Sequence, residues 1–260
     1  MRQMLRDISL ILAVCLPLLL PAAANTEGKL TDNIRISSKI LGYDLQYRIY
    51  LPEGATAEDR LPLLFVTDGQ WYLEPGNMKQ VLDQEIMSRR IKPVMAVFVD
   101  SRNPDDLMEN RRRDQFFCNI EYANFFAREL IPEISYNWPA SYRREDKVIM
   151  GLSFGGVNAA CFGLMLNKNF SGIAMQSPAN DQHLKLLRDL YKKEDHLPLK
   201  IFMSIGTKKD NTAAGRRFKQ TLQAKGYDLT YIEVEEGHNW KNWGPLIDDV
   251  LWTFFGTAND

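Results

Sequence analysis

Residues 147–163 read Lys-Val-Ile-Met-Gly-Leu-Ser-Phe-Gly-Gly-Val-Asn-Ala-Ala-Cys-Phe-Gly, and this stretch decides the fold. Its first part, from Val148 to Met150, is apolar throughout, which is typical of a strand that is covered on both faces. From Gly155 onward the residues are small or apolar, which favours a buried helix. Between the two lies Ser153, bracketed by Gly151 and Gly155. The sequence therefore predicts a strand that turns sharply into a helix, with a serine at the turn.

The G-x-S-x-G spacing at this turn indicates a reactive serine. A serine at such a strand-to-helix turn is held in a strained backbone conformation, and the flanking glycines let neighbouring segments approach without Cβ clashes. The turn would raise the Ser153 hydroxyl clear of the sheet edge, and the Phe154 N–H would point at an oxygen bonded beside it. Two glycines bracket a serine often enough by chance, so the prediction depends on the strand before and the helix after.

Strand and helix patterns alternate along the rest of the chain. Residues 34–38 and 45–51 alternate apolar and polar positions around Gly42, which predicts an antiparallel pair at a sheet edge. Further strands are expected at 61–67, 94–100, 148–150, 172–176, 200–206 and 229–234. Helices are expected at 76–90, 121–135, 184–192, 212–225 and 245–255, and residues 101–119 are interpreted as a loop. This order predicts an α/β fold: a mostly parallel sheet with an antiparallel N-terminal edge and helices on both faces.

The N-terminus has the pattern of an export signal. Arg2 and Arg6 precede an apolar run from Ile8 to Leu20, and small residues follow up to Ala24. This order predicts a signal peptide at residues 1–24, with a periplasmic or secreted protein as its product. The apolar run is too short and too interrupted by proline for a transmembrane helix, so no stable membrane insertion is expected after cleavage. Residues 25–260 then fit one α/β domain.

Charge and motif content exclude several classes of partner. Cleavage would remove two arginines and one aspartate, so the formal net charge of −1 becomes −2. This near-neutral balance argues against nucleic acid as a main partner. Because Cys118 and Cys161 are the two cysteines left, we expect no disulfide framework to support the fold. The chain has no H-E-x-x-H, C-x-x-C or phosphate-loop pattern, so we propose no metal and no nucleotide cofactor.

A nucleophilic serine needs a base to take its proton and an acid to orient that base. In a parallel sheet such groups gather at the carboxyl ends of the strands. His238 comes just after the last predicted strand, whereas His183 and His196 lie in a polar stretch and are interpreted as surface or structural residues. Asp210 directly follows the strand at 200–206, so the order along the chain is serine, aspartate, histidine.

Asp210 also has a simpler interpretation. Asp210 or Asn211 could do no more than cap the helix expected to begin near Thr212. The lysines at 208 and 209 are expected to be solvated, although they could help to keep Asp210 ionised.

These motifs together resemble the esterase branch of the α/β-hydrolases that includes enterochelin esterases, esterase D and feruloyl esterases. The resemblance covers nearly all of residues 25–260. It depends on Asp68-Gly69-Gln70, on residues 112–119 followed by 125–132, on residues 151–156, on Gln176-Ser177-Pro178, and on residues 236–240 with Trp243. The ending Gly-His-Asn-Trp-x-x-Trp is most similar to the catalytic domain of enterochelin esterases.

The resemblance implies Ser153 as nucleophile, His238 as base and Asp210 as acid. It implies an oxyanion hole formed by the backbone N–H groups of Phe154 and Gln70. Two departures from the family pattern bear on the site: many relatives carry an acidic residue at or next to position 209, and residue 115 is glutamine where an acidic residue is frequent. The implied activity is two-step hydrolysis of a small-molecule ester.

The candidate substrate-binding residues are Trp71, Arg112 and Trp240. Most charged runs such as Arg111-Arg112-Arg113 are solvated, but Arg112 matches a family position near the pocket and could contact an anionic group. The tryptophans could stack on an aromatic or sugar group, whereas Trp243 could equally pack the last helix. Siderophore trilactones or related aryl esters are the expected substrates. The alternatives are feruloyl or acetyl esters of polysaccharides, acyl transfer to a sugar, and a non-catalytic binding module.

Overall fold

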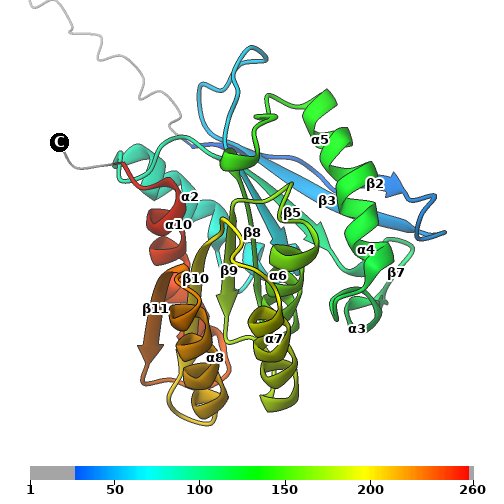
Figure 1. Ribbon diagram of the computed structural model, residues 1–260. Coiled ribbons are helices and arrows are strands. Elements are labelled where there is room, and N and C mark those ends of the chain that lie inside the picture. The colour runs from blue at the N-terminus through cyan, green and yellow to red at the C-terminus, as the bar shows by residue number, and fades with distance from the viewer. Residues whose placement is uncertain (1–26, 258–260) are drawn as a thin grey trace, which may run out of the picture.

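The computed structural model describes residues 27–257, so the predicted signal peptide at 1–24 lies outside the described residues. One nine-stranded sheet organises the described part of the chain, with the strand order β1-β3-β5-β4-β8-β9-β10-β11 and with β2 paired to β3 (Figure 1). Within residues 27–257, none of the helices has both the length and the apolar character needed to cross a lipid bilayer.

The centre of the sheet is parallel. Each strand pairs in parallel with its neighbour from β5 through β4, β8, β9 and β10 to β11. These strands are β4 (Leu63–Thr67), β5 (Met95–Asp100), β8 (Lys147–Leu152), β9 (Gly172–Gln176), β10 (Lys200–Gly206) and β11 (Asp228–Val234). Because parallel strands end at one edge, the residues after β4, β8, β9, β10 and β11 are brought together there.

The N-terminal edge is antiparallel, as predicted. β1 (Lys29–Leu30) and β2 (Ile34–Ser37) both pair antiparallel with β3 (Asp44–Leu51), and β3 pairs antiparallel with β5. The predicted α/β architecture with an antiparallel N-terminal edge is therefore confirmed, and the structure shows that the pairing changes from antiparallel to parallel at β5.

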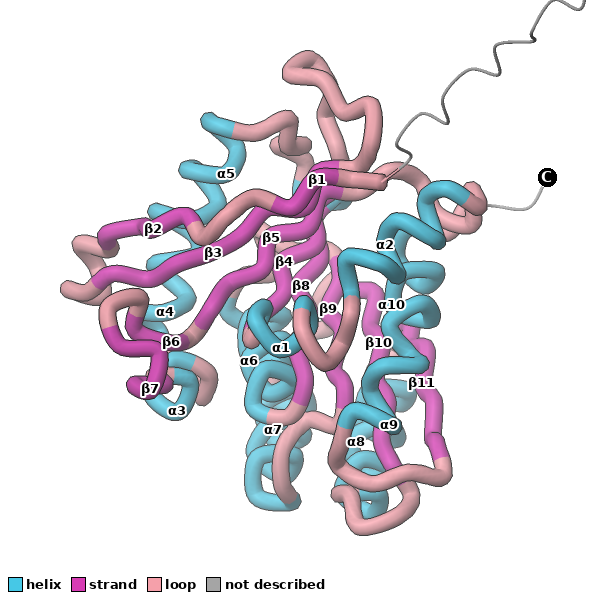
Figure 2. Tube along the Cα trace, turned by 180° about the vertical axis from the view of Figure 1, so that it is seen from behind, coloured by secondary structure: helices cyan, strands magenta, loops and turns pink. Residues whose placement is uncertain are grey.

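Helices cover both faces of the sheet (Figures 1 and 2). One face carries α1 (Gly69–Leu73), α2 (Met78–Met87) and α10 (Ile247–Phe255), with α9 (Trp240–Trp243) and the short turn η3 (Gly244–Leu246) before α10. The other face carries α4 (Ile120–Phe125), α5 (Ile131–Asn137), α6 (Phe154–Met165), α7 (Asp181–Lys193) and α8 (Thr212–Ala224). We refer to these as the α10 layer and the α6 layer.

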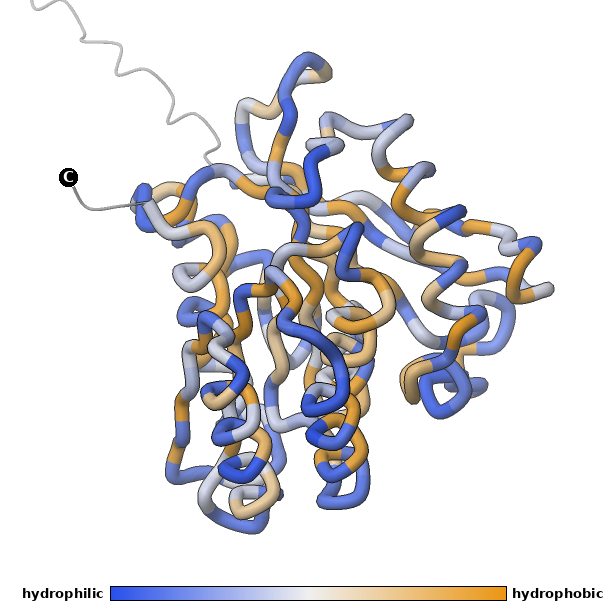
Figure 3. Tube along the Cα trace, in the orientation of Figure 1, coloured by the Kyte–Doolittle hydropathy of each residue, from blue (hydrophilic) through white to orange (hydrophobic). Residues whose placement is uncertain are grey.

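The buried strands supply one hydrophobic core to each layer, because alternate side chains point to opposite faces of a sheet. In β4, Leu63 and Phe65 belong to the core under the α6 layer, whereas Leu64 and Val66 belong to the core under the α10 layer. Figure 3 shows the complementary pattern on the outer helices, where hydrophilic and hydrophobic residues alternate along α7 and α8.

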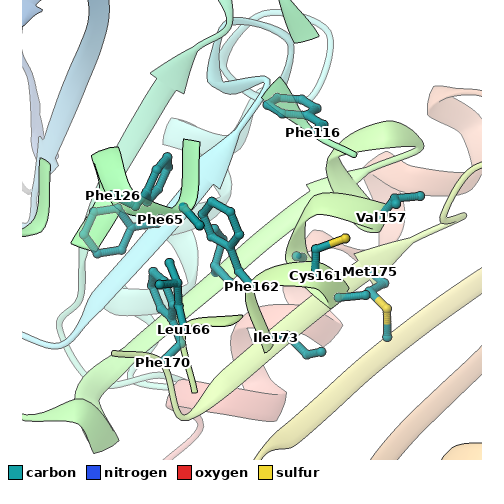
Figure 4. Packing of buried hydrophobic residues seen from close by; sticks show 14 of the residues in the cluster. Phe65, Phe116, Phe126, Val157, Cys161, Phe162, Leu166, Phe170, Ile173 and Met175 are labelled. Atoms are coloured by element: carbon teal, nitrogen blue, oxygen red, sulfur yellow. The ribbon is translucent and has the colours of Figure 1, made fainter. Parts of the chain in front are cut away.

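Aromatic rings fill much of the core under the α6 layer (Figure 4). Phe126 packs edge-on against Phe162 with ring centroids 4.9 Å apart, and Phe65 packs in the same way against Phe170 at 5.6 Å. Such edge-to-face pairs stabilise a core by about 0.5–1.5 kcal/mol beyond the burial of their surface. The packing fixes α6 on the sheet, and thereby the turn that precedes it.

Three local elements differ from the sequence-based expectations. The chain after β4 forms the short helix α1, which is not among the predicted helices. The expected loop at 101–119 contains a hairpin of β6 (Arg102–Asn103) and β7 (Asp106–Asn110), followed by α3 (Arg112–Gln115). The expected helix at 121–135 is present but contains a π-helical turn, η1 (Phe126–Leu130), just before Pro132. Proline has no N–H to donate, which accounts for the irregular turn at that point.

The expectation that no disulfide supports the fold is wrong. Cys118 and Cys161 form a disulfide, with their Cα atoms 5.0 Å apart. Cys161 lies on α6, and Cys118 lies in the segment between α3 and α4 that crosses over α6. Two cysteines are too few for a framework of several disulfides, but they are enough for one bridge once the tertiary structure brings them together.

Removal of this bridge is expected to destabilise the fold. The disulfide closes a loop with a sequence separation of 43 residues. Restricting the unfolded chain over such a loop typically stabilises a protein by about 2–4 kcal/mol. We therefore expect the Cys118→Ser/Cys161→Ser variant to lose about that much free energy of unfolding in denaturant titrations. Equal midpoints and slopes for the variant and the oxidised wild type would contradict this assignment.

Candidate active site

The turn after β8 holds Ser153 in an unusual backbone conformation. Its φ is 55° and its ψ is −118°, a region that non-glycine residues rarely adopt and that costs about 1–3 kcal/mol. The Ser153 N–H donates to the Gln176 carbonyl at 2.8 Å, and the Ser153 carbonyl accepts from the Ala179 N–H at 3.1 Å. These bonds to β9 and the residues after it hold the turn in place.

The two glycines of the motif permit a close approach of three segments. A Cβ atom on Gly151 would lie 2.4 Å from the Gly155 carbonyl carbon and 2.5 Å from Thr67 Oγ1. A Cβ atom on Gly155 would lie 2.9 Å from the same Thr67 oxygen. Both positions therefore exclude a side chain, as the sequence motif implies, because the turn packs directly against the end of β4.

Ser153, His238 and Asp210 are brought together at the carboxyl edge of the sheet. His238 Nε2 lies 2.9 Å from Ser153 Oγ, and His238 Nδ1 lies 2.9 Å from Asp210 Oδ1. Since a carboxylate faces Nδ1, that nitrogen carries the hydrogen, and Nε2 is free to accept from the serine hydroxyl. The His238 side chain is 33% exposed, whereas that of Asp210 is fully buried.

Asp210 accepts more hydrogen bonds than a helix cap requires. Its Oδ1 accepts from His238 Nδ1 and the Asn211 N–H, and its Oδ2 accepts from Ser177 Oγ at 2.6 Å and the Gly206 N–H at 2.8 Å. Burial acts to raise the pKa of Asp210, but these hydrogen bonds outweigh it and lower the pKa to about 2. Asp210 is therefore ionised throughout the neutral range and oriented toward the imidazole.

Ser177 and Asn242, which were not predicted as site residues, both donate to Asp210 Oδ2, at 2.6 and 3.4 Å. Ser177 is completely buried at a φ of 43°, and its hydroxyl accepts from Asn242 Nδ2 and Trp243 Nε1, both at 3.0 Å, while it donates to Asp210. The one sequence feature that points to this role is that Ser177 lies in the Gln-Ser-Pro segment of the family motif. The Trp243 ring also meets the His238 ring edge-on at 5.0 Å. Trp243 therefore supports the site by packing, and is 7% exposed.

The two residues predicted to form the oxyanion hole both lie in the first turn of a helix. Gln70 is the second residue of α1, and Phe154 is the first residue of α6. The first N–H groups of a helix have no partner within it, so both amides are available to an external acceptor. α1 follows Asp68, which is itself left-handed with a φ of 55°.

Arg112 is placed beside this segment, where it pairs with Asp68. Its Nη2 and Nε lie 2.7 and 3.1 Å from the two Asp68 carboxylate oxygens, and the Asp68 side chain is fully buried. Burial raises the pKa of Asp68 to about 6, although the Arg112 guanidinium opposes the rise. Arg112 also lies over the Trp71 ring, 4.9 Å from its centroid. The pair thus anchors the start of α1 next to Ser153.

The tryptophans predicted to bind substrate lie on the side of the site that the α10 layer forms. Trp71 is half-buried under Arg112. Trp240 is also half-buried, and it packs edge-on against Tyr72 and Trp243, each with ring centroids 5.6 Å apart. Trp240 thus contributes to packing as well as to the surface near His238. Among residues 27–257, no group of three His, Cys, Asp or Glu side chains is placed to hold a metal ion.

The fold and this site define the chain as an α/β-hydrolase-type protein, and comparison with known proteins gives its family. The model of the family described as "Putative esterase" matches residues 38–254, so the chain belongs to that esterase family. It is similar to the "uncharacterized protein YjcH" of Bacillus subtilis, with 25% identity over 225 residues that cover 82% of this chain and 92% of the relative. It is also similar to an acetyl esterase of Caldicellulosiruptor saccharolyticus, with 26% identity over 60% of this chain and 70% of the relative.

Two solved structures share the fold. An enterobactin esterase from Shigella flexneri superposes with a TM-score of 0.76 at 23% identity, over 90% of this chain and 60% of the other. A ferulic acid esterase superposes with a TM-score of 0.72 at 18% identity, over 88% of this chain and 98% of the other. The chain thus spans about three fifths of that enterobactin esterase. The family and its relatives support carboxylic ester hydrolysis as the activity class of the chain.

The buried Ser177 hydroxyl offers a test of how Asp210 is held. Ser177→Ala removes a hydrogen bond to a carboxylate and leaves Asn242 and Trp243 with one fewer acceptor, so kcat/KM for a simple ester should fall about tenfold. Ser37→Ala, an exposed serine on β2, is the matched control and should behave as wild type. Identical kinetics for Ser177→Ala and the control would show that Asp210 does not depend on this contact.

Asp210 should also leave a signature in the pH dependence of stability. Because its pKa is lowered from 3.8 to about 2 in the folded state, the unfolded chain binds its proton first as the pH falls. Its stabilising contribution is therefore complete above about pH 4 and is lost as the pH falls toward 2. We expect Asp210→Asn to show a weaker decrease in unfolding free energy across that window than wild type, measured by urea titration. If the unfolding free energies of the two proteins depended on pH in the same way, the lowered pKa of Asp210 would be contradicted.

Proposed function

We propose that the protein is a serine carboxylic-ester hydrolase that works through an acyl-enzyme intermediate. The observation that carries the proposal is the unbroken hydrogen-bond chain from Ser153 Oγ through the His238 ring to Asp210. A serine hydroxyl is a weak nucleophile by itself, and a base within hydrogen-bond reach activates it. The 2.9 Å separation of His238 Nε2 from Ser153 Oγ fits that requirement.

In the first step, Ser153 Oγ attacks the ester carbonyl carbon while its proton moves to His238 Nε2. The backbone N–H groups of Gln70 and Phe154 stabilise the negative charge that develops on the carbonyl oxygen. The tetrahedral intermediate then collapses, the bond to the alcohol oxygen breaks, and that oxygen takes the proton from His238. Asp210 stays ionised and stabilises the imidazolium, which forms transiently in each step.

In the second step, water attacks the acyl-enzyme carbonyl and gives one proton to His238 Nε2. The second intermediate releases the carboxylic acid, and Ser153 Oγ recovers its proton from His238. The net reaction is ester plus water to acid plus alcohol, and it needs no co-reactant beyond water. If an alcohol such as a sugar hydroxyl replaced the water, the same steps would give acyl transfer.

As substrates we propose siderophore trilactones or related aryl esters. Arg112, Trp71 and Trp240 would bind them, because a guanidinium and indole rings suit a planar, electron-rich aromatic group. The similarity to an enterobactin esterase supports this choice. The similarity to an acetyl esterase and to a ferulic acid esterase supports the second candidate, deacylation of acetylated or feruloylated polysaccharides.

We also propose that residues 1–24 direct export and that residues 25–260 act as one catalytic domain. The Cys118–Cys161 disulfide supports an oxidising compartment, since such bonds persist outside the cytosol.

The direct test of the mechanism is Ser153→Ala. With the attacking oxygen removed, kcat for a nitrophenyl ester should fall by about 10⁵-fold or more, to a residual rate due to the oxyanion hole and binding. The kcat of His238→Ala should fall by a similar factor, because the two residues act as a unit. Folding is checked by thermal unfolding of each variant. Undiminished ester turnover by Ser153→Ala would refute the proposed mechanism.

The substrate class is tested with a panel of esters. Short nitrophenyl esters, ferric and iron-free catecholate lactones, and feruloyl sugars are ranked by kcat/KM. We expect the catecholate lactones to rank first. A first rank for feruloyl or acetyl sugars would favour the polysaccharide alternative, and ester product formed with an added alcohol would identify acyl transfer.

A further inference from the structure

A continuous aromatic surface begins at the residue next to the nucleophile. The Phe154 ring lies 4.9 Å from the His183 ring, and the His183 ring lies 4.6 Å from the Phe117 ring, measured between centroids. Phe154 follows Ser153 directly, His183 lies in the first turn of α7, and Phe117 lies between α3 and α4. We name these three residues the aromatic wall. The sequence predicts a surface or structural role for His183, and Phe117 lies within residues 112–119 of the family motif.

The rings of the aromatic wall are partly exposed, and the Arg112 guanidinium lies 5.6 Å from the centroid of the Phe154 ring. Phe117 is 42% exposed, and Phe154 and His183 are half-buried. Burial lowers the pKa of His183 below its ordinary value, which favours the neutral form of its imidazole. Exposed apolar rings beside a reactive serine are the kind of lining that small-molecule sites use.

The disulfide fixes this wall. Cys118 is adjacent to Phe117, and Cys161 lies seven residues after Phe154 on α6. Seven residues are two helical turns, so Phe154 and Cys161 share one face of α6. Figure 4 shows Cys161 on α6 within the packed core cluster. The bridge thus holds the Phe117 segment against the helix face that bears Phe154. A surface fixed in this way loses little conformational entropy when a ligand binds.

The position of the wall relative to His238 indicates which part of an ester it contacts. The departing alcohol takes its proton from His238 Nε2 and must lie beside that ring. The His238 ring packs against Trp243, next to the α10 layer. The wall is instead built by α6, α7 and the segment before α4, in the α6 layer. A group on the wall is therefore separated from the leaving-group side.

We propose that Phe154, His183 and Phe117 form the acyl subsite and that it selects esters whose acyl part carries a planar aromatic group over esters of acetic acid. This inference rests on the proposed ester hydrolysis at Ser153. A planar aromatic group offers these three rings more apolar contact area than an acetyl methyl group does. The assignment adds Phe117 and His183 to the residues that determine specificity.

The test compares two esters with the same leaving group. We expect wild type to prefer nitrophenyl benzoate to nitrophenyl acetate in kcat/KM, and Phe117→Ala and His183→Ala each to lower that preference about tenfold. His183→Phe keeps a ring in place and should retain the preference. Tyr136→Ala, which removes an aromatic side chain 89% exposed on α5, is the matched control. An unchanged benzoate-to-acetate ratio in both Phe117→Ala and His183→Ala overturns the inference.

A second pair of esters distinguishes the acyl group from the alcohol. Phenyl acetate and methyl acetate share the acyl group and differ in the alcohol. If Phe117→Ala lowers the phenyl-to-methyl ratio and leaves the benzoate-to-acetate ratio unchanged, the wall binds the alcohol and the acyl assignment is wrong. Failure of the proposed function has a different outcome, because wild type would then turn over none of these esters.

The role of the disulfide is tested separately, by the benzoate-to-acetate ratio of a variant that lacks it. If the bridge positions Phe117, Cys118→Ser/Cys161→Ser should lower the benzoate-to-acetate ratio in the same direction as Phe117→Ala. A purely structural role would lower both rates by one common factor. That second result would contradict the positioning role of the bridge.

Discussion

The site depends on one strained residue, Ser153, whose backbone is held at a positive φ between a buried strand and a buried helix. Such a conformation persists only where the surroundings determine it more strongly than the local preference of the chain. Here β8 is covered on both faces, α6 is packed into the aromatic core, and the turn is hydrogen-bonded to the end of β9. The sheet and its helices therefore determine where the Ser153 hydroxyl oxygen points.

The remaining site residues follow from the same edge of the sheet. Asp210 follows β10 and His238 follows β11, so parallel pairing brings both residues to the sheet edge where Ser153 lies. The buried Ser177 hydroxyl then links Asp210 to Asn242 and Trp243, which ties Asp210 to the helix that follows His238. On the other side, the Arg112–Asp68 pair anchors the start of α1 and one predicted oxyanion donor. Two independent networks thus hold the two halves of the site.

Most of the fold and the central site residues could be predicted from the sequence, because they depend on local patterns. Continuous apolar runs gave the buried strands, and G-x-S-x-G, with its strand and helix, gave the turn. What could not be predicted depends on contacts between distant segments. The Cys118–Cys161 bridge forms because the segment before α4 crosses α6, and the ring of His183 meets Phe154 because α7 begins beside the turn. Neither contact leaves a periodic pattern in the sequence.

The most direct measurement of the central claim is covalent labelling with a fluorophosphonate, mapped by peptide mass spectrometry. This reagent phosphonylates a serine whose hydroxyl is activated by a neighbouring base. The account predicts one adduct, on Ser153, at a rate that falls sharply in His238→Ala. No adduct on the folded wild-type protein, or an adduct on another serine at an equal rate in both proteins, would contradict it.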